Sequence, residues 1–528
     1  MSNDPQLESQ GVPKREKKEH FKTDHLNDDI GGRTARGGFV TMTSHLLKFF
    51  ITLVATIVMA RLLTPEDYGL IGMVIVFTNY MTMFKDMGLS LATVQRAEIS
   101  FEQISTLFWI NVLLSFGITV LAIALAPGIA FFYGEPRLIL ITIVVATGFI
   151  LGGLSVQHEA LLKRQMRFGA LATISTVALV VGYVVGIVAA WSGAGYWAIV
   201  ASQLSLIGTS TLGTWIVSGW IPGRPRRGTG VRPMLTFGRN ITGYATINVL
   251  AKNLDTLMLG RYWGAQNLGL YQKASLLVAI PTDGTNEPFN SVAIPALSRL
   301  VDSPERYREA FLRILEKVAL LTMPCVAALI ATSDWVVQLL LGPQWTASGR
   351  ILIIIAIAGL FQPIVSATHW LFVTQGRTHH MFQWALIYAP LSVISVFAGL
   401  KWGPLGVAIS YAIGRLCLID HLLYWFAGRT GPVRTVDIYK VVAPIAAASA
   451  LGAGAALCFR QVTHIQNPLL GCILCGLIVV LVTALALYFI PAGRRALVDI
   501  KSLLRLLTGR AEAAVAENLA GVRPGSAT

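Results

Sequence analysis

Long apolar stretches alternate with short polar segments along most of the chain, from residue 39 to residue 490. Each stretch holds about 20 residues, the length that an α-helix needs to cross the hydrocarbon core of a bilayer. About fourteen stretches can be placed, so we predict an all-α polytopic membrane protein. The predicted spans are residues 39–60, 69–87, 105–126, 138–156, 170–190, 196–217, 236–259, 270–294, 314–332, 350–373, 381–399, 404–427, 440–459 and 468–490.

Basic residues are unevenly distributed between these stretches. Of the 42 lysines and arginines, 29 fall in every second segment counted from the N-terminus, six fall in the intervening segments, and seven lie within spans. Because insertion keeps Lys and Arg on the cytoplasmic side, both termini are predicted to be cytoplasmic. The six residues predicted outside are Arg61, Arg137, Arg261, Arg350, Lys401 and Arg460.

The composition agrees with this class. The chain is 54% hydrophobic and 13% charged, and its mean hydropathy is +0.63, whereas charged residues make up about 25% of a soluble domain. The net charge of +15 does not indicate a nucleic-acid partner, because the basic residues are dispersed over short loops and form no stripe with interleaved aromatic residues.

A ten-residue segment occurs twice at equivalent places. Residues 61–70 (RLLTPEDYGL) follow the first span and residues 261–270 (RYWGAQNLGL) follow the seventh, so that Arg61 aligns with Arg261 and Gly69 with Gly269. Six spans separate the two sites, and an even number makes the repeat parallel, as in several transporter folds. The alternative is a recurring interfacial turn, in which Arg reaches the headgroups and Gly ends a helix.

The repeat predicts two six-helix lobes followed by two extra helices. Residues 1–38 are predicted to form a disordered cytoplasmic tail, 39–217 the N-terminal lobe, 218–235 a cytoplasmic linker, 236–427 the C-terminal lobe, 428–490 spans thirteen and fourteen, and 491–528 an amphipathic basic helix and cytoplasmic tail. The basic tail fits a helix lying on the membrane surface or the positive flank of the last span.

Charges within the spans mark a candidate binding cavity, since a charge at mid-bilayer costs roughly 2.5 to 3.5 kcal/mol. Polar residues recur at helical spacing around Lys48 in span one and Lys252 in span seven, so both helices present a polar stripe. We predict that these stripes line a central cavity. The candidate substrate-binding residues are Lys48, Lys252, Asp255, Lys273 and Arg415.

Packing roles are the alternative for these charges. Lys252 and Asp255 could form an ion pair that only packs the bundle, and for Lys273 and Arg415 cavity lining and packing remain equally open. Lys85, Lys317 and Arg239 are expected to pack or to reach the interface.

Span eight carries three prolines, seven residues apart. Pro281, Pro288 and Pro295 flank a polar stretch that includes Glu287. Proline bends a helix and frees a carbonyl, and such sites occur in membranes where protein or water satisfies the backbone. A kinked, water-facing helix is predicted; a re-entrant break or a misplaced boundary is the alternative.

The chain lacks the motifs of several enzyme classes. It has no glycine-rich P-loop with its lysine, no G-x-S-x-G, no paired-aspartate cluster on a cytoplasmic loop and no long outward loop. Cys472 and Cys475 form a C-x-x-C among apolar residues with no nearby histidine or second pair, so a metal site is not predicted. We therefore predict no catalytic residues, metal or cofactor.

Residues 60–96 resemble the hallmark of the Wzx-type flippases, the polysaccharide transport branch of the multidrug, oligosaccharidyl-lipid and polysaccharide exporter superfamily. In that branch R-L-L-x-P-x-D-[YF]-G is followed by a span and by D-x-G-L-x-x-A-x-x-Q-R. The matching residues are Arg61, Leu62, Leu63, Pro65, Asp67, Tyr68, Gly69, Asp86, Gly88, Leu89, Gln95 and Arg96. Further similarity at residues 253–271, Pro281 and residues 294–300 extends the resemblance to about residues 39–430.

The resemblance implies two helical lobes around a cavity that opens in turn to each side of the bacterial cytoplasmic (inner) membrane. It also implies a polyprenyl diphosphate-linked oligosaccharide as substrate, flipped to the outer leaflet for exopolysaccharide, capsule or O-antigen assembly. Lys48, Lys252 and Lys273 could supply point charges for the diphosphate. A polysaccharide polymerase and a chain-length regulator are candidate partners.

Two other transporters remain possible. A lipid II flippase also has fourteen spans and a basic cavity. A cation-coupled multidrug exporter of the same superfamily usually has twelve spans and an acidic cavity, whereas the spans of this chain hold more basic than acidic residues.

Overall fold

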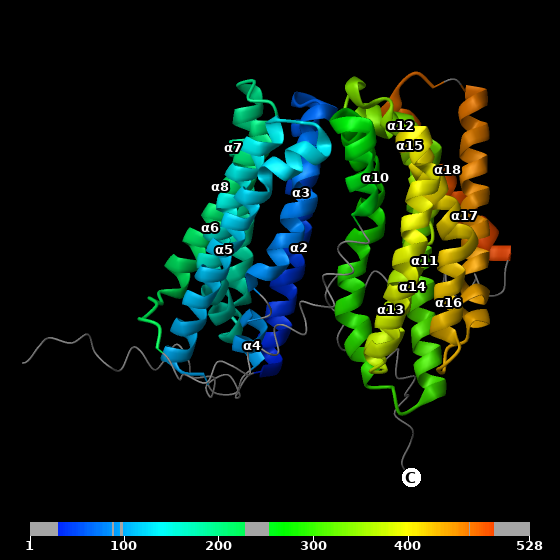
Figure 1. The fold of residues 1–528 in the computed structure, drawn as a ribbon. Helices are drawn as coiled ribbons and strands as arrows, with labels where there is room; N and C mark the ends of the chain where they lie inside the picture. The colour runs from blue at the N-terminus through cyan, green and yellow to red at the C-terminus, as the bar shows by residue number, and fades with distance from the viewer. Residues whose placement is uncertain (1–29, 87–88, 96–98, 227–252, 464, 490–528) are drawn as a thin grey trace, which may run out of the picture.

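A computed structural model describes residues 30–86, 89–95, 99–226, 253–463 and 465–489 of the chain. Every regular element in these ranges is helical, and the helices form two bundles side by side (Figure 1). Nine stretches in the described ranges are long and apolar enough to cross a membrane. The all-α polytopic class is therefore confirmed. The number of fourteen spans stays a prediction, since most of the predicted seventh span lies outside the described residues.

Seven helices are described in the N-terminal half. They are α2 (Ile30–Leu62), α3 (Pro65–Asp86), α4 (Leu89–Gln95), α5 (Phe101–Tyr133), α6 (Arg137–Arg164), α7 (Phe168–Trp191) and α8 (Tyr196–Ser218). Local signals set several of these ends. The Ser100 hydroxyl accepts a hydrogen bond from the Gln103 backbone N–H and the Gln103 side chain accepts one from the Ser100 N–H, a capping box that starts α5. Gly134, with φ of 70°, ends it.

The C-terminal half is interrupted more often. It contains α10 (Leu254–Ser298), α11 (Pro304–Leu340), the 3₁₀ turn η2 (Pro343–Trp345), α12 (Ser348–Gly359), α13 (Gln362–Thr374), α14 (Thr378–Gly399), the 3₁₀ turn η3 (Leu400–Trp402), α15 (Gly403–Gly414), the π-helical turn η4 (Arg415–Ile419), α16 (Asp420–Gly428), α17 (Thr435–Thr463) and α18 (Pro468–Phe489). Predicted span ten thus comprises two helices, α12 and α13.

Helix α10 joins the end of predicted span seven to span eight. Its backbone leaves the helical region at Gly264, where φ is 76° and ψ is 178°, a conformation that glycine adopts without steric cost. Gly264 lies in the predicted loop between the two spans. The backbone is helical from Ala265 to Ser298, through Pro281 and Pro295, so the structure does not show the re-entrant break that was the alternative for span eight.

The predicted extra helices α17 and α18 pack against each other and against α11. Every fourth residue of α18 is buried, as in Gly471, Cys475, Val479 and Thr483. The opposite face exposes Leu477, Leu481 and Leu485 among others, as expected of a helix whose other side faces lipid.

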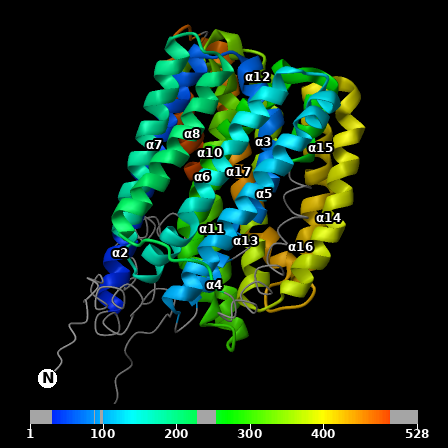
Figure 2. The ribbon, with the colours of Figure 1, turned by 60° about the vertical axis from the view of Figure 1, so that its left-hand side comes forward.

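Arg61, Arg137, Arg261 and Lys401 lie at one end of the molecule, which we call the Arg61 end. Contacts between segments distant in sequence define it: Arg137 pairs with Glu66, and the Trp263 indole donates to the Leu400 carbonyl at 2.7 Å. Figure 2 shows the same arrangement after rotation, with α7 and α14 at opposite edges. Hydrogen bonds from Arg61 to Leu339 and from Gln344 and Trp345 to the end of α2 join the two halves at the Arg61 end.

Candidate functional site

The first repeat segment begins helix α3 with a reciprocal cap. The Thr64 hydroxyl and backbone N–H both donate to the Asp67 carboxylate, at 2.7 and 2.9 Å, and the Asp67 N–H donates to the Thr64 hydroxyl at 3.2 Å. Pro65 occupies the first helical position, where its missing N–H costs no hydrogen bond. The motif residues Pro65 and Asp67 therefore fix where α3 starts.

The two repeat segments contact each other through their glycines. A Cβ atom added to Gly69 would lie 1.8 Å from the Ala265 carbonyl oxygen, and one added to Gly269 would lie 1.8 Å from the Pro65 carbonyl oxygen. Ala265 occupies in the second segment the position of Pro65 in the first. The contact is thus reciprocal, as across a two-fold axis, and no larger side chain fits at either glycine.

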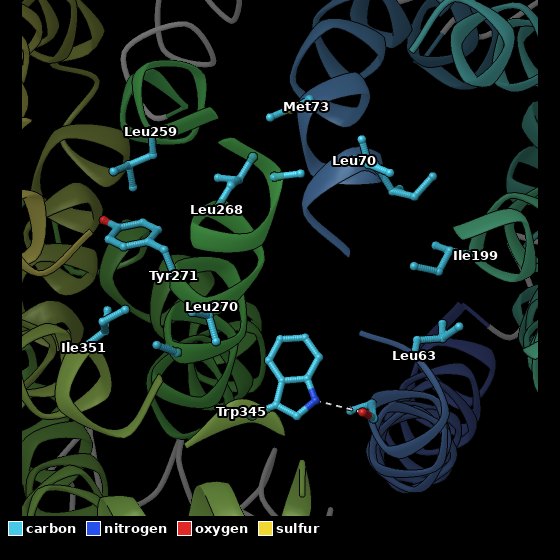
Figure 3. Packing of buried hydrophobic residues seen from close by; sticks show 14 of the residues in the cluster. Leu63, Leu70, Met73, Ile199, Leu259, Leu268, Leu270, Tyr271, Trp345 and Ile351 are labelled. Carbon is cyan, nitrogen blue, oxygen red and sulfur yellow. Dashed lines mark hydrogen bonds between the residues drawn. The ribbon is translucent and has the colours of Figure 1, made fainter. Parts of the chain in front are cut away.

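The carboxyl end of α2 is bonded to the C-terminal half. The Ala60 carbonyl oxygen accepts hydrogen bonds from the Gln344 side-chain amide at 2.9 Å and from the Trp345 indole at 2.8 Å (Figure 3), and the Arg61 guanidinium donates to the Leu339 carbonyl at the end of α11. The last carbonyls of a helix have no partner within it. Residues from the other half supply one here.

The second repeat segment makes the corresponding contacts with the N-terminal half. The Arg261 guanidinium carbon lies 5.8 Å from the centre of the Phe132 ring, at the end of α5. A Cβ atom on Gly260 would lie 2.7 Å from the Tyr133 ring and 3.2 Å from Met73. Arg61 and Arg261 therefore both reach across to the end of a helix in the opposite half.

A surface charge cluster borders this contact. Arg137 donates to Glu135 at 2.7 Å and to Glu66 at 2.6 Å. The hydrogen bond from Arg137 lowers the pKa of Glu135 below its ordinary value. All three side chains are partly exposed, so the ion pairs contribute little to stability.

Lys273 lies inside the contact between the halves. Its side chain is 6% exposed, and its Nζ atom lies 3.5 Å from the centre of the Tyr68 ring on α3 and 5.9 Å from that of Trp345. Here Lys273 is packed, yet its partner Tyr68 belongs to the other half.

Asp255 and Arg415 are both engaged within the C-terminal half. One Asp255 oxygen accepts a hydrogen bond from the Tyr271 hydroxyl at 2.9 Å, and the other accepts one from the Thr256 N–H at 2.7 Å. Arg415 donates to both oxygens of Asp420, at 3.2 and 3.1 Å, and to the Gln362 side chain at 2.6 Å. The buried Asp420 carboxylate balances the charge of Arg415.

Lys48 lies on α2 with its side chain half-buried. Arg61 follows it by thirteen positions, which places Lys48 about 20 Å along the helix from the Arg61 end. The remaining predicted positions fall outside the residues or side chains that the structure describes: Lys252, Asp86, Gly88, Gln95, Arg96, Glu287 and Pro288. Their roles stay predictions.

Sequence reasoning missed a buried polar network in the N-terminal half. The Thr93 hydroxyl donates to the Gln157 carbonyl oxygen at 3.0 Å, and the Gln157 amide donates to the Asn111 oxygen at 2.9 Å. All three side chains are fully buried. They are neutral and widely spaced in sequence, so no charge or motif signals them. Within the described ranges no cluster of three or more His, Cys, Asp or Glu side chains could hold a metal ion.

Solved structures with the same architecture are transporters. The structure of lipid II flippase MurJ in an inward closed conformation aligns with a TM-score of 0.66 at 17% identity, covering 86% of this chain and 98% of that one. An inward-facing multidrug resistance MATE family transporter of the MOP superfamily aligns with a TM-score of 0.56 at 16% identity, covering 74% and 96%. These likenesses establish the fold.

Sequence relatives come from polysaccharide biosynthesis. The teichuronic acid biosynthesis protein TuaB of Bacillus subtilis (strain 168) is 28% identical over 66% of this chain and 72% of its own length. The lipopolysaccharide biosynthesis protein WzxC of Escherichia coli (strain K12) is 25% identical over 75% and 80%. The succinoglycan biosynthesis transport protein ExoT of Rhizobium meliloti (strain 1021) is 23% identical over 70% and 74%.

A family profile described as polysaccharide biosynthesis protein matches residues 58–350, which is more than half of the 528 residues. The match includes both repeat segments and the whole of the described contact between the halves. The chain therefore belongs to the polysaccharide biosynthesis protein family.

Proposed function

We propose that this protein moves a polyprenyl diphosphate-linked oligosaccharide from the cytoplasmic to the outer leaflet of the bacterial cytoplasmic membrane, for exopolysaccharide, capsule or O-antigen assembly. Membership of the polysaccharide biosynthesis family is the observation that carries the proposal. The relatives named for teichuronic acid, lipopolysaccharide and succinoglycan biosynthesis support it. The proposed activity is transport and makes or breaks no covalent bond.

The charges of the spans suit this substrate. A diphosphate needs cations where it crosses the membrane, and Lys48 and Lys252 are our proposed partners for it. A negative-inside membrane potential favours outward movement of an anion by roughly 2.3 kcal/mol per charge per 100 mV. The potential can therefore contribute to the direction of transport. A polymerase and a chain-length regulator would take the product at the outer leaflet.

We further propose that the Arg61 end faces outside and that both termini are cytoplasmic. The charge distribution supports this orientation, since the six basic residues of the intervening segments include Arg61, Arg137 and Arg261. With this orientation, the contact between the repeat segments closes the molecule toward the outside. Substrate would enter between the halves from the cytoplasmic side.

Flipping in vesicles tests the function directly. Lipid-linked oligosaccharides extracted from a strain that lacks the protein are incorporated with the purified protein into liposomes, and an impermeant enzyme modifies the sugars that reach the outer leaflet. We expect the modified fraction to rise from about one half toward completion within minutes, because the protein brings inner-leaflet lipid to the enzyme. Without the protein it should stay near one half, because a polar headgroup crosses unaided bilayers slowly. Protein-free vesicles serve as the control.

The same assay distinguishes the alternative substrate. When the vesicles contain lipid II in place of the oligosaccharide lipid, the modified fraction should remain near one half. Rapid movement of lipid II with no movement of the oligosaccharide lipid would instead identify a lipid II flippase, and the absence of both would remove the proposed function.

Cysteine labelling tests the orientation. In a cysteine-free background, single cysteines at Ser192, Thr346 or Thr463 should react with an impermeant thiol reagent in intact cells, whereas cysteines at Asp302 or Thr430 should not. These five positions are exposed. Ser192, Thr346, Thr430 and Thr463 lie at or just after helix ends, and Asp302 lies in the turn between α10 and α11. Ser218 and Ser348 are unsuitable because both are buried. Labelling of the cysteines at Asp302 or Thr430 would show that the proposed orientation is wrong.

A further inference from the structure

The Lys273 ammonium group lies near aromatic rings from both halves of the molecule. Lys273 comes from α10 and Tyr68 from α3, and Trp345 comes from the turn that follows α11. The Tyr68 and Trp345 rings themselves meet edge to face, with centres 5.5 Å apart and planes at 67°. These ring faces are the described electrostatic partners of the buried charge, and an ammonium over a ring face is a favourable cation–π contact.

The contact is favourable only while the halves are together. Separating α3 from α10 removes Tyr68 from Lys273, and the ammonium must then be solvated by water or by an anion. A buried lysine without a partner is costly. Two effects therefore oppose each other at this residue: the rings favour the closed arrangement, and the hydration of the charge favours the open one.

Trp345 couples the charge to the rest of the contact. Its indole N–H donates to the Ala60 carbonyl at the end of α2, while its ring faces Tyr68 and Lys273. Met73 lies at the same contact, beside Gly260 (Figure 3). At Gly69 and Gly269 the backbones of the two halves are in direct contact. A small separation of the halves therefore disrupts all of these contacts together.

We propose that Tyr68, Lys273 and Trp345 form a cation–π latch that holds the Arg61 end closed and opens in each transport cycle. The latch assigns a role to the aromatic position of the family-like motif R-L-L-x-P-x-D-[YF]-G, where Tyr68 stands in this chain. It rests on the proposed function only for the statement that opening belongs to a transport cycle. Closure itself can be measured without substrate.

A buried reporter cysteine measures the opening. Met73 is 1% exposed, so Met73→Cys in a chain whose five native cysteines are replaced should react with a maleimide only when the halves separate. The purified full-length protein is labelled in lipid nanodiscs, which makes the result independent of orientation. The labelling rate is then proportional to the open fraction.

A double-mutant cycle isolates the interaction between the charge and the ring. Tyr68→Leu should accelerate labelling in the Lys273 background about tenfold more than in the Lys273→Met background, which lacks the charge. Tyr68→Phe should leave the rate unchanged, because the ring face and not the hydroxyl is the partner. Lys273→Met alone removes both the ring contact and the hydration cost of the charge, so the interaction is measured by the cycle and not by this single variant.

Native Cys475 provides the matched control. It lies on α18, fully buried against α11 and α17 and away from the contact, and a chain that retains only this cysteine should label at the same rate with and without Tyr68→Leu. Equal acceleration by Tyr68→Leu in both backgrounds would show that Tyr68 acts through packing and would overturn the latch. Loss of flipping in the vesicle assay with the cycle intact would instead reject the proposed function and leave the latch standing.

Discussion

Deletion of the gene for this protein is expected to eliminate one surface polysaccharide and to leave its lipid-linked oligosaccharide on the cytoplasmic leaflet, without changing tolerance to ethidium or norfloxacin. The reason is the sign of the charges in the predicted cavity. Cationic residues attract a diphosphate and repel an organic cation, by several kcal/mol at close range even at an effective dielectric near 20. Gel analysis of surface polysaccharide, leaflet assays of the lipid-linked precursor and growth with each drug measure the three effects.

Complementation with the intact gene controls for effects on neighbouring genes. An intact set of surface polysaccharides combined with greater sensitivity to cationic dyes would place the multidrug exporter first. Loss of cell-wall synthesis with all surface polysaccharides retained would favour lipid II as the substrate.

Charge reversal at Lys48 or Lys252 is expected to abolish polysaccharide export while the protein still inserts. A carboxylate about 5 Å from a phosphate charge is repelled by about 3 kcal/mol at an effective dielectric of 20, which corresponds to more than a hundredfold weaker binding. Lys48→Arg and Lys252→Arg keep the charge and should retain part of the activity. Export is measured in the deletion strain, and membrane quantity by immunoblot.

Lys401→Glu is the matched control, because Lys401 lies exposed in the turn η3 at the Arg61 end. This variant should export normally at the same protein quantity. If both Lys48→Glu and Lys252→Glu also export normally, neither residue belongs to the substrate path. Loss of protein from the membrane would point to a structural role for these lysines.

The sequence predicted the local architecture well because the bilayer imposes it. A span must be helical and about 20 residues long, so apolar runs give its position almost directly. The repeat was also visible, since Arg61, Gly69 and Leu70 recur at the same spacing as Arg261, Gly269 and Leu270. Its physical basis emerged in the structure, where the two glycines allow a backbone contact.

The charged residues show the limit of sequence reasoning. Lys273 and Arg415 both interrupt apolar helices, and the sequence around each residue supports packing and cavity lining equally. The structure places Lys273 against the Tyr68 ring of the other half and Arg415 against Asp420 within its own half. The partner of a buried charge depends on how distant helices meet, which no local pattern encodes.

The helical membrane class and the internal repeat can be predicted from the amino-acid sequence, because hydrophobic length and segment spacing are local properties. Which helix ends meet can be read from the folded chain alone. The Ala60 carbonyl and the Trp345 indole are 285 residues apart in the chain, and their hydrogen bond depends on the close approach of the two halves at Gly69 and Gly269. Contacts of this kind arise from packing geometry, and that geometry is fixed by the whole chain at once.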